Sequence, residues 1–343
     1  MELQKKKNQK FNYGLGILKV ILAFYVICGH NFNPKSTKSK TLLYILRKRR
    51  IHVPSFFIMS FYFLYRELII PNINFYIKRI ERLLIPYFFW PIIVFILNNL
   101  LLVKLFNLKK YSFNDLKNQL IWGDIFIGQF WFQWVLIFLT SIFYSIRYIS
   151  EKNFLFLIQI LSYFSYILQY SGINKKFNDF LDKNKKLTVG RINEMIPFAV
   201  TGSALACLGI IKKIKLFKLK TLSFCILIFG SLEKYHVFSK LQGGVAYPGI
   251  LLNVRSICLI FFFSLFPSEN ITNINLEKIL RKITNYTTGI FYLHITIINY
   301  FKLFIKPIKY GNLYGCIVIY LICYLISFFG TSIVGKSKLK FLF

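Results

Sequence analysis

Long apolar stretches separated by short basic segments are the feature that most limits what this chain can fold into. A helix of about 20 apolar residues crosses the hydrocarbon core of a bilayer, and stretches near this length recur between residues 15 and 329. Backbone polar groups inside lipid must be paired within the protein, which favours helices. The sequence therefore predicts an all-α fold, a polytopic membrane helix bundle of about ten transmembrane helices.

The predicted spans follow one another along nearly the whole chain. They are Leu15–Asn31, Val53–Ile70, Leu83–Val103, Phe130–Tyr148, Phe154–Tyr170, Met195–Ile211, Thr221–Leu232, Gly249–Phe266, Thr288–Ile305 and Leu313–Phe329. No internal repeat and no Gly/Ser-rich or Pro-rich linker divides them. We therefore expect residues 1–343 to form a single membrane domain with no appended soluble domain.

Composition and charge support a membrane protein rather than a nucleic-acid-binding protein. The chain is 56% hydrophobic and only 17% charged, whereas average soluble domains are about 45–50% apolar and about 25% charged. The net charge is +33, and a soluble protein with that balance would suggest nucleic acid. Here the basic residues lie between the apolar stretches, where they would meet anionic lipid headgroups.

The basic residues near the two ends of the chain predict its orientation in the membrane. An even number of spans places both termini on one side, and lysines precede the first span and follow the last. Lys and Arg are enriched in cytoplasmic segments. We therefore expect a multi-pass protein of the plasma membrane with both termini cytoplasmic, although basic residues in other connecting segments nearly balance this signal.

The cysteine pattern gives no support for a disulfide framework or a metal site. All six cysteines fall inside apolar stretches, and no two form a C-x-x-C pair. They are expected to be buried, unreactive helix residues. They are Cys28, Cys207, Cys225, Cys258, Cys316 and Cys323.

Two ionisable residues in the first predicted span are candidates for function, because charge inside a membrane is costly. Lys19 and His30 are eleven residues apart, about three helical turns, so they share a face and lie about 16 Å apart along the axis. Histidine is well suited to take a proton from a hydroxyl near neutral pH. Cys28 faces away from His30, which argues against a Cys–His dyad. The alternative is that both residues simply lie near opposite membrane interfaces.

A pair of arginines precedes the third predicted span. Arg79 and Arg82 are three residues apart, so they lie on one helix face. Guanidinium groups bind phosphate oxygens in a bidentate manner, which makes this pair a candidate phosphate site. The competing interpretation is a basic anchor at the membrane surface.

Three further residues are weaker candidates for contact with a substrate. His52 lies just before a helix expected to open near Pro54, Trp131 belongs to an aromatic run, and His294 lies within a late span. The aromatic run could be an interfacial belt or a surface for sugar stacking. A single intramembrane histidine could equally be bonded to a neighbouring helix.

Taken together, these residues resemble the acyltransferase-3 family of bacterial integral membrane O-acyltransferases. The first helix of that family carries a basic residue, ten intervening residues and a histidine, here Lys19 and His30, although Arg is usual at the first position. The Arg-x-x-Arg element matches Arg79 to Arg82. The second-helix signature of the family is similar to Val53–Ser60, although Phe61 stands where the family has Gly. Similar later landmarks are Phe130–Phe132, Ile196–Gly202 and Ile290–His294.

The resemblance implies transfer of an acyl group, with acetyl as the default, from acyl-CoA to a hydroxyl of a cell-surface or exopolysaccharide glycan. It implies His30 as the general base and binding of acyl-CoA phosphates by Lys19, Arg79 and Arg82. Further groups would orient the substrate or stabilise the oxyanion, namely His52, Trp131 and His294. Acyl-CoA (acetyl-CoA) would be a donor substrate, and no permanently bound cofactor or metal is expected. The other expected partners are the glycan or lipid-linked carbohydrate acceptor and membrane lipids. No nucleic acid is expected as a partner.

Two other functions remain open from the sequence. The main alternative is an exporter or flippase for a glycan or a lipid-linked sugar, which would need no acyl-CoA. A membrane glycosyltransferase is a third option, but such enzymes generally use acidic residues, and no paired carboxylate motif occurs. The few aspartates are expected in connecting segments, at Asp115, Asp124, Asp179 and Asp182.

Overall fold

The computed structural model describes residues 12–31, 51–68, 72–102, 110–123, 130–170, 187–209, 249–264, 274–304 and 313–334. Within these ranges all regular structure is helical, which confirms the predicted all-α fold. The helices are α2 (Tyr13–Asn31), α4 (His52–Leu68), α5 (Ile73–Leu97) with a short π-helix η1 (Asn98–Leu102), α7 (Phe113–Trp122), α8 (Phe130–Ile149), α9 (Phe154–Tyr170), α11 (Leu187–Cys207), α14 (Gly249–Ser264), α15 (Ile274–Phe304) and α16 (Leu313–Val334).

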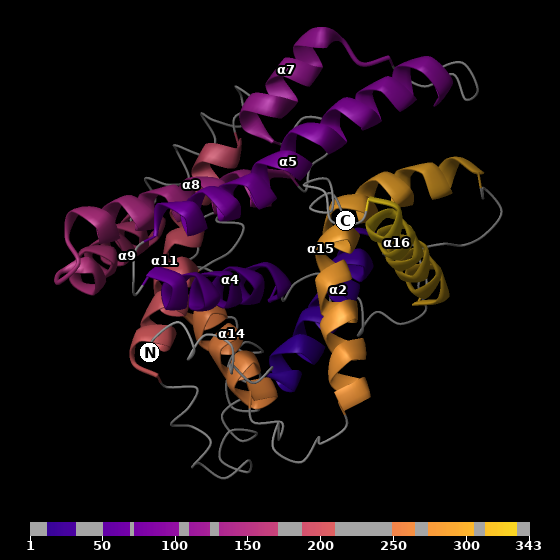
Figure 1. Ribbon diagram of the computed structural model, residues 1–343. Coiled ribbons are helices and arrows are strands. Elements are labelled where there is room, and N and C mark those ends of the chain that lie inside the picture. The colour runs from indigo at the N-terminus through magenta and orange to yellow at the C-terminus, as the bar shows by residue number, and fades with distance from the viewer. Residues whose placement is uncertain are drawn as a thin grey trace.

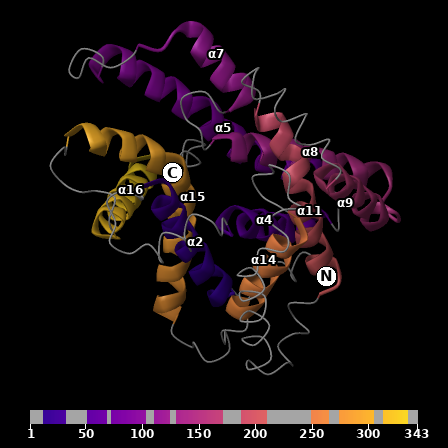
Figure 2. The same ribbon diagram turned by 180° about the vertical axis from the view of Figure 1, so that it is seen from behind.

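Helix α4 lies near the centre of the bundle, and helices from distant parts of the sequence pack around it (Figures 1 and 2). Its most extensive partner is α11, and α14 lies along the same side. On the other side, α2 and α15 run next to each other although more than 240 residues separate them, and α16 covers α15. Helix α5 crosses the bundle diagonally, with α7 beside its carboxyl end, and it also packs against α8.

Three helical stretches in the described ranges are long and apolar enough to cross a membrane. They are Tyr13–Asn31, Ile73–Leu100 and Phe130–Ile149. Shorter apolar stretches occur in α9, α14, α15 and α16. The chain is therefore a helical protein with membrane-spanning character. The total of about ten spans stays a prediction, because Thr221–Leu232 lies outside the described residues.

The outer helices expose large apolar side chains, as expected of surfaces that face lipid. On α9 these include Phe156, Tyr163 and Phe164, each more than half exposed, and on α16 they include Leu321 and Phe329. Soluble monomers rarely expose apolar surface on this scale. Hydrocarbon chains can cover such surface without any protein partner.

Two helices begin well before the apolar stretches that predicted them. Helix α5 starts at Ile73 rather than Leu83, and the Asn72 side chain caps it by accepting a hydrogen bond from the Asn74 backbone. Helix α15 starts at Ile274 rather than Thr288. Hydropathy marks only the part of a helix that matches lipid, so the polar first turns escaped the prediction. Arg79 and Arg82 therefore lie within α5, in agreement with the prediction from their spacing that they share a helix.

Helix α7 was not predicted, and it corrects the expectation that Asp115 lies in a loop. The Ser112 side chain accepts from the Asp115 backbone while the Asp115 carboxylate accepts from the Ser112 backbone, a reciprocal capping box. The helix ends at Gly123, whose φ of 72° is readily adopted by glycine. Hydropathy does not predict α7, because this short helix is amphipathic and not apolar along its whole length.

The cysteines in the described ranges follow the prediction with one exception. Cys28, Cys258, Cys316 and Cys323 are buried, whereas Cys207 is exposed. Cys207 is the last residue of α11, so the helix ends where burial by neighbouring helices ends. The expectation that every cysteine is buried was wrong at this position, and Cys225 lies outside the described residues.

Close packing of α11 against α4 depends on a glycine. A Cβ added at Gly202 would overlap the carbonyl group of Ile58 and lie 2.9 Å from the backbone nitrogen of Tyr62. The carboxyl end of α4 is held by Arg147 of α8, whose Nε donates to the carbonyl of Leu68 at 2.8 Å. These contacts fix the position of α4, which carries several residues of the candidate site.

Hydrogen bonds join the first turns of α2 and α15. These turns lie outside the apolar part of α15, which covers Gly289–Asn299. The Tyr13 hydroxyl donates to Glu277 Oε2 at 3.0 Å, and Arg281 Nε donates to Glu277 Oε1 at 2.7 Å. The hydrogen bond from Arg281 and, to a smaller extent, that from Tyr13 lower the pKa of the Glu277 carboxyl below its usual value. The ionised carboxylate therefore links the two helices that carry His30 and His294.

Candidate functional site

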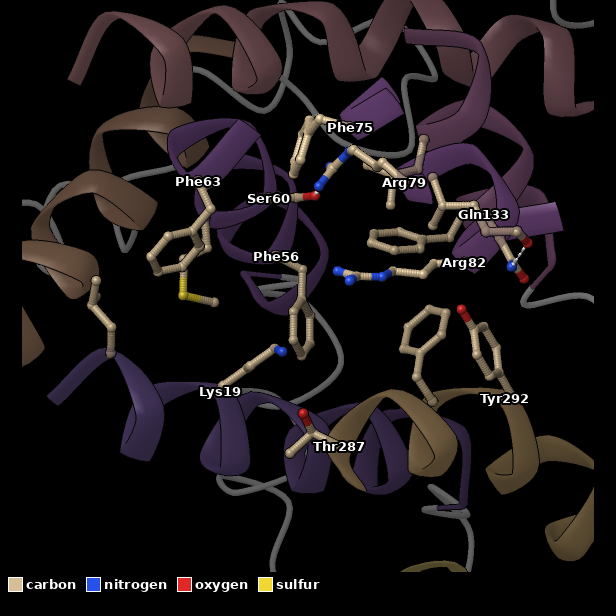
Figure 3. A pocket seen from close by; sticks show the side chains of 16 residues that line it. Lys19, Phe56, Ser60, Phe63, Phe75, Arg79, Arg82, Gln133, Thr287 and Tyr292 are labelled. Carbon is tan, nitrogen blue, oxygen red and sulfur yellow. Dashed lines mark hydrogen bonds between the residues drawn. The ribbon is translucent and has the colours of Figure 1, made fainter. Parts of the chain in front are cut away.

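A cavity of about 340 Å³ lies where α2, α4, α5, α8 and α15 meet (Figure 3). Its volume is near the lower end of the range for small-molecule sites, about 300–1,000 Å³. Aromatic and aliphatic side chains make up most of its wall, with a few polar groups among them. The lining residues are Leu15, Lys19, Phe56, Met59, Ser60, Phe63, Phe75, Arg79, Arg82, Leu83, Phe132, Gln133, Leu136, Thr287, Phe291 and Tyr292.

The cavity brings together the three cations that the sequence singled out. Lys19 enters from α2, whereas Arg79 and Arg82 enter from α5 (Figure 3). No acidic residue is among the described residues that line it. Cations grouped in a partly apolar space stabilise an anion bound between them, because desolvated charge needs a partner. The arrangement is thus suited to phosphate or another polyanionic group.

Two side chains from other helices hold α5 in place at this cavity. Arg79 Nη2 donates to Ser60 Oγ of α4 at 2.8 Å. Gln133 Nε2 of α8 donates to the backbone carbonyl of Leu83. Ser60 belongs to the stretch that resembles the second-helix signature, so the structure gives that serine a specific role in positioning an arginine.

Three histidines, His30, His52 and His294, lie close together at the other end of α2. The rings of His30 and His294 have centroids 5.2 Å apart. His52 is buried 5.1 Å from the ring of Tyr25, and its Cε1 would lie 3.9 Å from a Cβ added at Gly29. His30 itself is exposed at the end of α2. Helices α2, α4 and α15 therefore each contribute one imidazole to a single region.

The hydrogen bonds of His294 fix which of its nitrogens carries a proton. The ring is fully buried, and Nδ1 lies 2.8 Å from the carbonyl oxygen of Phe291 and 3.2 Å from that of Ile290. Carbonyl oxygens only accept hydrogen bonds, so Nδ1 is assigned the hydrogen. In the neutral ring Nε2 then bears a lone pair, and it has no hydrogen-bond partner among the described residues.

The cavity and the histidines are neighbouring parts of one site. Phe56, which lines the cavity, follows His52 by four residues, about one helical turn. Phe291, which also lines it, precedes His294 by three residues, and their ring centroids are 5.7 Å apart. His30 does not line the cavity; it lies about 16 Å along α2 from Lys19, by the rise of eleven helical residues.

Trp131 is placed apart from both clusters. It is 6% exposed, so it lies neither in an interfacial belt nor on an open surface. The guanidinium carbon of Arg191 lies 4.3 Å from its ring centroid, a cation–π contact. That face of the indole is therefore covered, and stacking of a sugar on it would require Arg191 to move.

Sequence reasoning missed several lining residues because their roles depend on contacts between helices. Gln133 and Phe75 carry no spacing signal that distinguishes them from other residues of apolar helices. Phe56, Phe132 and Phe291 lie within stretches that resemble family landmarks, and this was their only signal. In the described ranges, no group of three or more His, Cys, Asp or Glu side chains is arranged to hold a metal ion.

The fold and the site together define a helical membrane protein with a cationic cavity next to a histidine cluster. A family model described as an acyltransferase domain matches residues 12–335, essentially the whole chain. The chain therefore belongs to the acyltransferase-3 family, as its motifs predicted. No curated protein and no solved structure matches it.

Proposed function

We propose that this membrane acyltransferase moves a short acyl group, with acetyl as the default, from acyl-CoA to a hydroxyl of a cell-surface or exopolysaccharide glycan. The observation that carries the proposal is the cavity that gathers Lys19, Arg79 and Arg82. A cluster of histidines that includes His30 lies one helical turn beyond it. Phosphate-binding and proton-transfer groups thus occupy adjacent parts of one site.

The cationic groups would bind the phosphates of the donor. Arginine pairs bind phosphate oxygens through paired N–H groups, and lysine adds a point charge. A cavity of about 340 Å³ accommodates only part of acyl-CoA, so the adenosine would stay outside, beyond the exposed Arg82. The pantetheine arm would then follow α2 towards His30, a path of about 16 Å.

The chemistry assigned to His30 is general base catalysis. The imidazole removes the proton of the acceptor hydroxyl as its oxygen attacks the thioester carbonyl. Collapse of the tetrahedral intermediate breaks the carbon–sulfur bond, and the imidazolium returns the proton to the departing sulfur. The products are the acyl ester of the glycan and free CoA. The exposed position of His30 at the end of α2 lets a large acceptor reach it.

His294 would position His30 rather than contact the oxyanion. An oxyanion needs a hydrogen-bond donor, and the Nε2 of neutral His294 can only accept. With ring centroids 5.2 Å apart, a small rotation lets Nε2 accept the N–H of His30 and fix its tautomer, leaving the other nitrogen as the base. His52, buried beside Gly29, would orient the same end of α2.

The proposed placement in the cell follows from where the two substrates occur. Acyl-CoA is made in the cytoplasm, and its phosphates cannot cross lipid. A multi-pass protein of the plasma membrane with both termini cytoplasmic would open the cationic cavity inwards. The glycan hydroxyl would approach His30 from the opposite face. Lipid-linked or surface carbohydrate is then the acceptor class that fits.

Donor binding tests the proposal directly. The double variant Arg79→Gln/Arg82→Gln should weaken binding of acetyl-CoA by about 10- to 100-fold, since each arginine would lose charge-assisted hydrogen bonds. The matched control is Lys110→Gln/Lys117→Gln, which removes the same charge at exposed positions on and next to α7. Equal binding by wild type and the arginine variant would contradict the assignment. Glycan export without any acyl-CoA requirement would instead support an exporter or flippase.

A further inference from the structure

Three phenylalanines form a closely packed cluster on one side of the cavity. The phenylalanine cluster consists of Phe56 of α4, Phe132 of α8 and Phe291 of α15, and all three line the cavity. The ring centroids of Phe132 and Phe291 are 4.7 Å apart, and Phe56 lies 6.2 Å from Phe291 and 6.4 Å from Phe132. These separations are the usual contact distances of aromatic pairs, so the three rings form a continuous surface.

The phenylalanine cluster lies between the cations and the histidines. Phe56 is one turn from His52, and Phe291 is one turn from His294 with their rings in contact. The opposite end of the cavity is formed by residues such as Phe63, which is seven residues beyond Phe56 on α4 and 44% exposed. The acyl end of a donor held by its phosphates at Lys19, Arg79 and Arg82 and directed towards His30 therefore lies against this cluster.

Phe56 and Phe291 differ from the phenylalanines that fill the core. Phe57 and Phe61 of the same helix are fully buried and contribute nothing to the cavity wall. Phe56 and Phe291 are only partly buried, with part of each ring facing the open space. Their exposed ring surface is thus available to a ligand.

We infer that Phe56 and Phe291 are specificity-determining residues that restrict the donor to short acyl groups. The inference rests on the proposed function, because it concerns the acyl group carried by CoA. The acyl carbons extend beyond the thioester carbonyl, so they enter the space that the phenylalanine cluster occupies. An acetyl group adds one methyl there, whereas each further methylene must displace a ring that is in contact with two others.

The test compares acyl donors of different length. Purified protein in proteoliposomes is assayed with acetyl-CoA and hexanoyl-CoA, and the ratio of the two kcat/KM values is measured. One methylene in an apolar pocket changes selection by about 10- to 200-fold, so wild type should favour acetyl-CoA at least about 10-fold. Phe56→Ala and Phe291→Ala should each lower that ratio about 10-fold, mainly through a better KM for hexanoyl-CoA.

Phe63→Ala is the matched control, because it removes the same ring from the far end of the same cavity and should leave the ratio unchanged. Phe56→Leu keeps most of the packing, so a smaller shift in the same direction would follow even if the alanine variants fold poorly. Wild type that uses both donors equally, or variants that keep the wild-type ratio, would overturn the inference. Transfer of acetyl by wild type in either case leaves the proposed function standing.

Discussion

Single hydrogen bonds decide where the charged groups of the site lie. Ser60 accepts from Arg79, so a residue of α4 with no charge of its own fixes a guanidinium of α5. His294 donates from Nδ1 to backbone carbonyls, so its other nitrogen faces the site as an acceptor. Ser60 thus sets the position of the Arg79 guanidinium, and the backbone carbonyls set which nitrogen of His294 can accept a hydrogen bond.

Removal of the Ser60 hydroxyl tests this positioning. In Ser60→Ala the guanidinium of Arg79 loses a fixed acceptor, and hydrogen bonds to charged groups contribute about 1.5–3 kcal/mol. Part of that is recovered by bonding to water, so we expect the KM for acetyl-CoA to rise about 3- to 10-fold with little change in kcat. Steady-state kinetics over a range of acetyl-CoA concentrations measures both.

Ser141→Ala is the control for this variant. Ser141 also accepts a hydrogen bond from α5, in this case from the Tyr76 hydroxyl at 3.0 Å, but it does not line the cavity. Its KM should stay at the wild-type value. A rise of equal size in both variants would show that α5 as a whole has shifted, and not that Arg79 has lost its position.

At the residue scale the sequence predicted the charged part of the site and missed its apolar part. The spacing of Lys19 and His30, and that of Arg79 and Arg82, identified residues that the structure places in or beside one cavity. Phe56 lies in a stretch that resembles a family landmark, but its place in an aromatic cluster could not be predicted, because the other rings of that cluster belong to α8 and α15. Spacing along one helix carries no information about a contact between helices.

At the scale of helices, close approach of α4 and α11 sets the geometry of the site. Among the helices that the structure describes, these two pack together most extensively, and Gly202 allows their close approach. The sequence predicted both helices, since their apolar stretches are long. It could not predict that they cross at this glycine, or that polar turns extend α5 and α15, because hydropathy does not report on either.

Substitution of Gly202 should therefore destabilise the whole bundle. In Gly202→Ala the new methyl group meets backbone atoms of Ile58 and Tyr62, which cannot move away as a side chain could. Overpacking of this kind typically costs about 1–3 kcal/mol. We expect a lower melting temperature in detergent, measured by the intrinsic tryptophan fluorescence, together with reduced yield of folded protein.

A second glycine provides the comparison for that measurement. A Cβ at Gly29 would meet only His52 Cε1, at the ordinary contact distance of 3.9 Å. Alanine is favoured over glycine within a helix by about 1 kcal/mol, so Gly29→Ala should melt at or above the wild-type temperature. If Gly202→Ala melted like Gly29→Ala, the close crossing of α4 and α11 would be contradicted.

At the scale of the whole molecule, the sequence predicted most of the architecture because lipid imposes it. The all-α fold and the places of nine of the ten predicted spans match helices in the described ranges. The amphipathic α7 was missed, since its formation depends on a capping box rather than on hydropathy. The orientation stays a prediction, because basic segments occur on both sides in nearly equal number.

The proposed function assigns two separable roles to the assembled site, donor binding to the cationic cavity and proton transfer to His30. His30 does not line the cavity, so its loss should leave acetyl-CoA binding intact. General base catalysis typically contributes about 10²- to 10⁴-fold to a rate. A variant at this position can therefore separate the chemical step from binding.

The most direct measurement is label transfer from radiolabelled acetyl-CoA to a lipid-linked glycan extract, by purified protein in proteoliposomes. Wild type should transfer the label, and His30→Ala should lose about 10²- to 10⁴-fold of the rate while it binds acetyl-CoA and melts like wild type. Near-normal turnover by His30→Ala would contradict its role as the base. Absence of transfer by wild type, over several acyl donors and acceptors, would contradict the account as a whole.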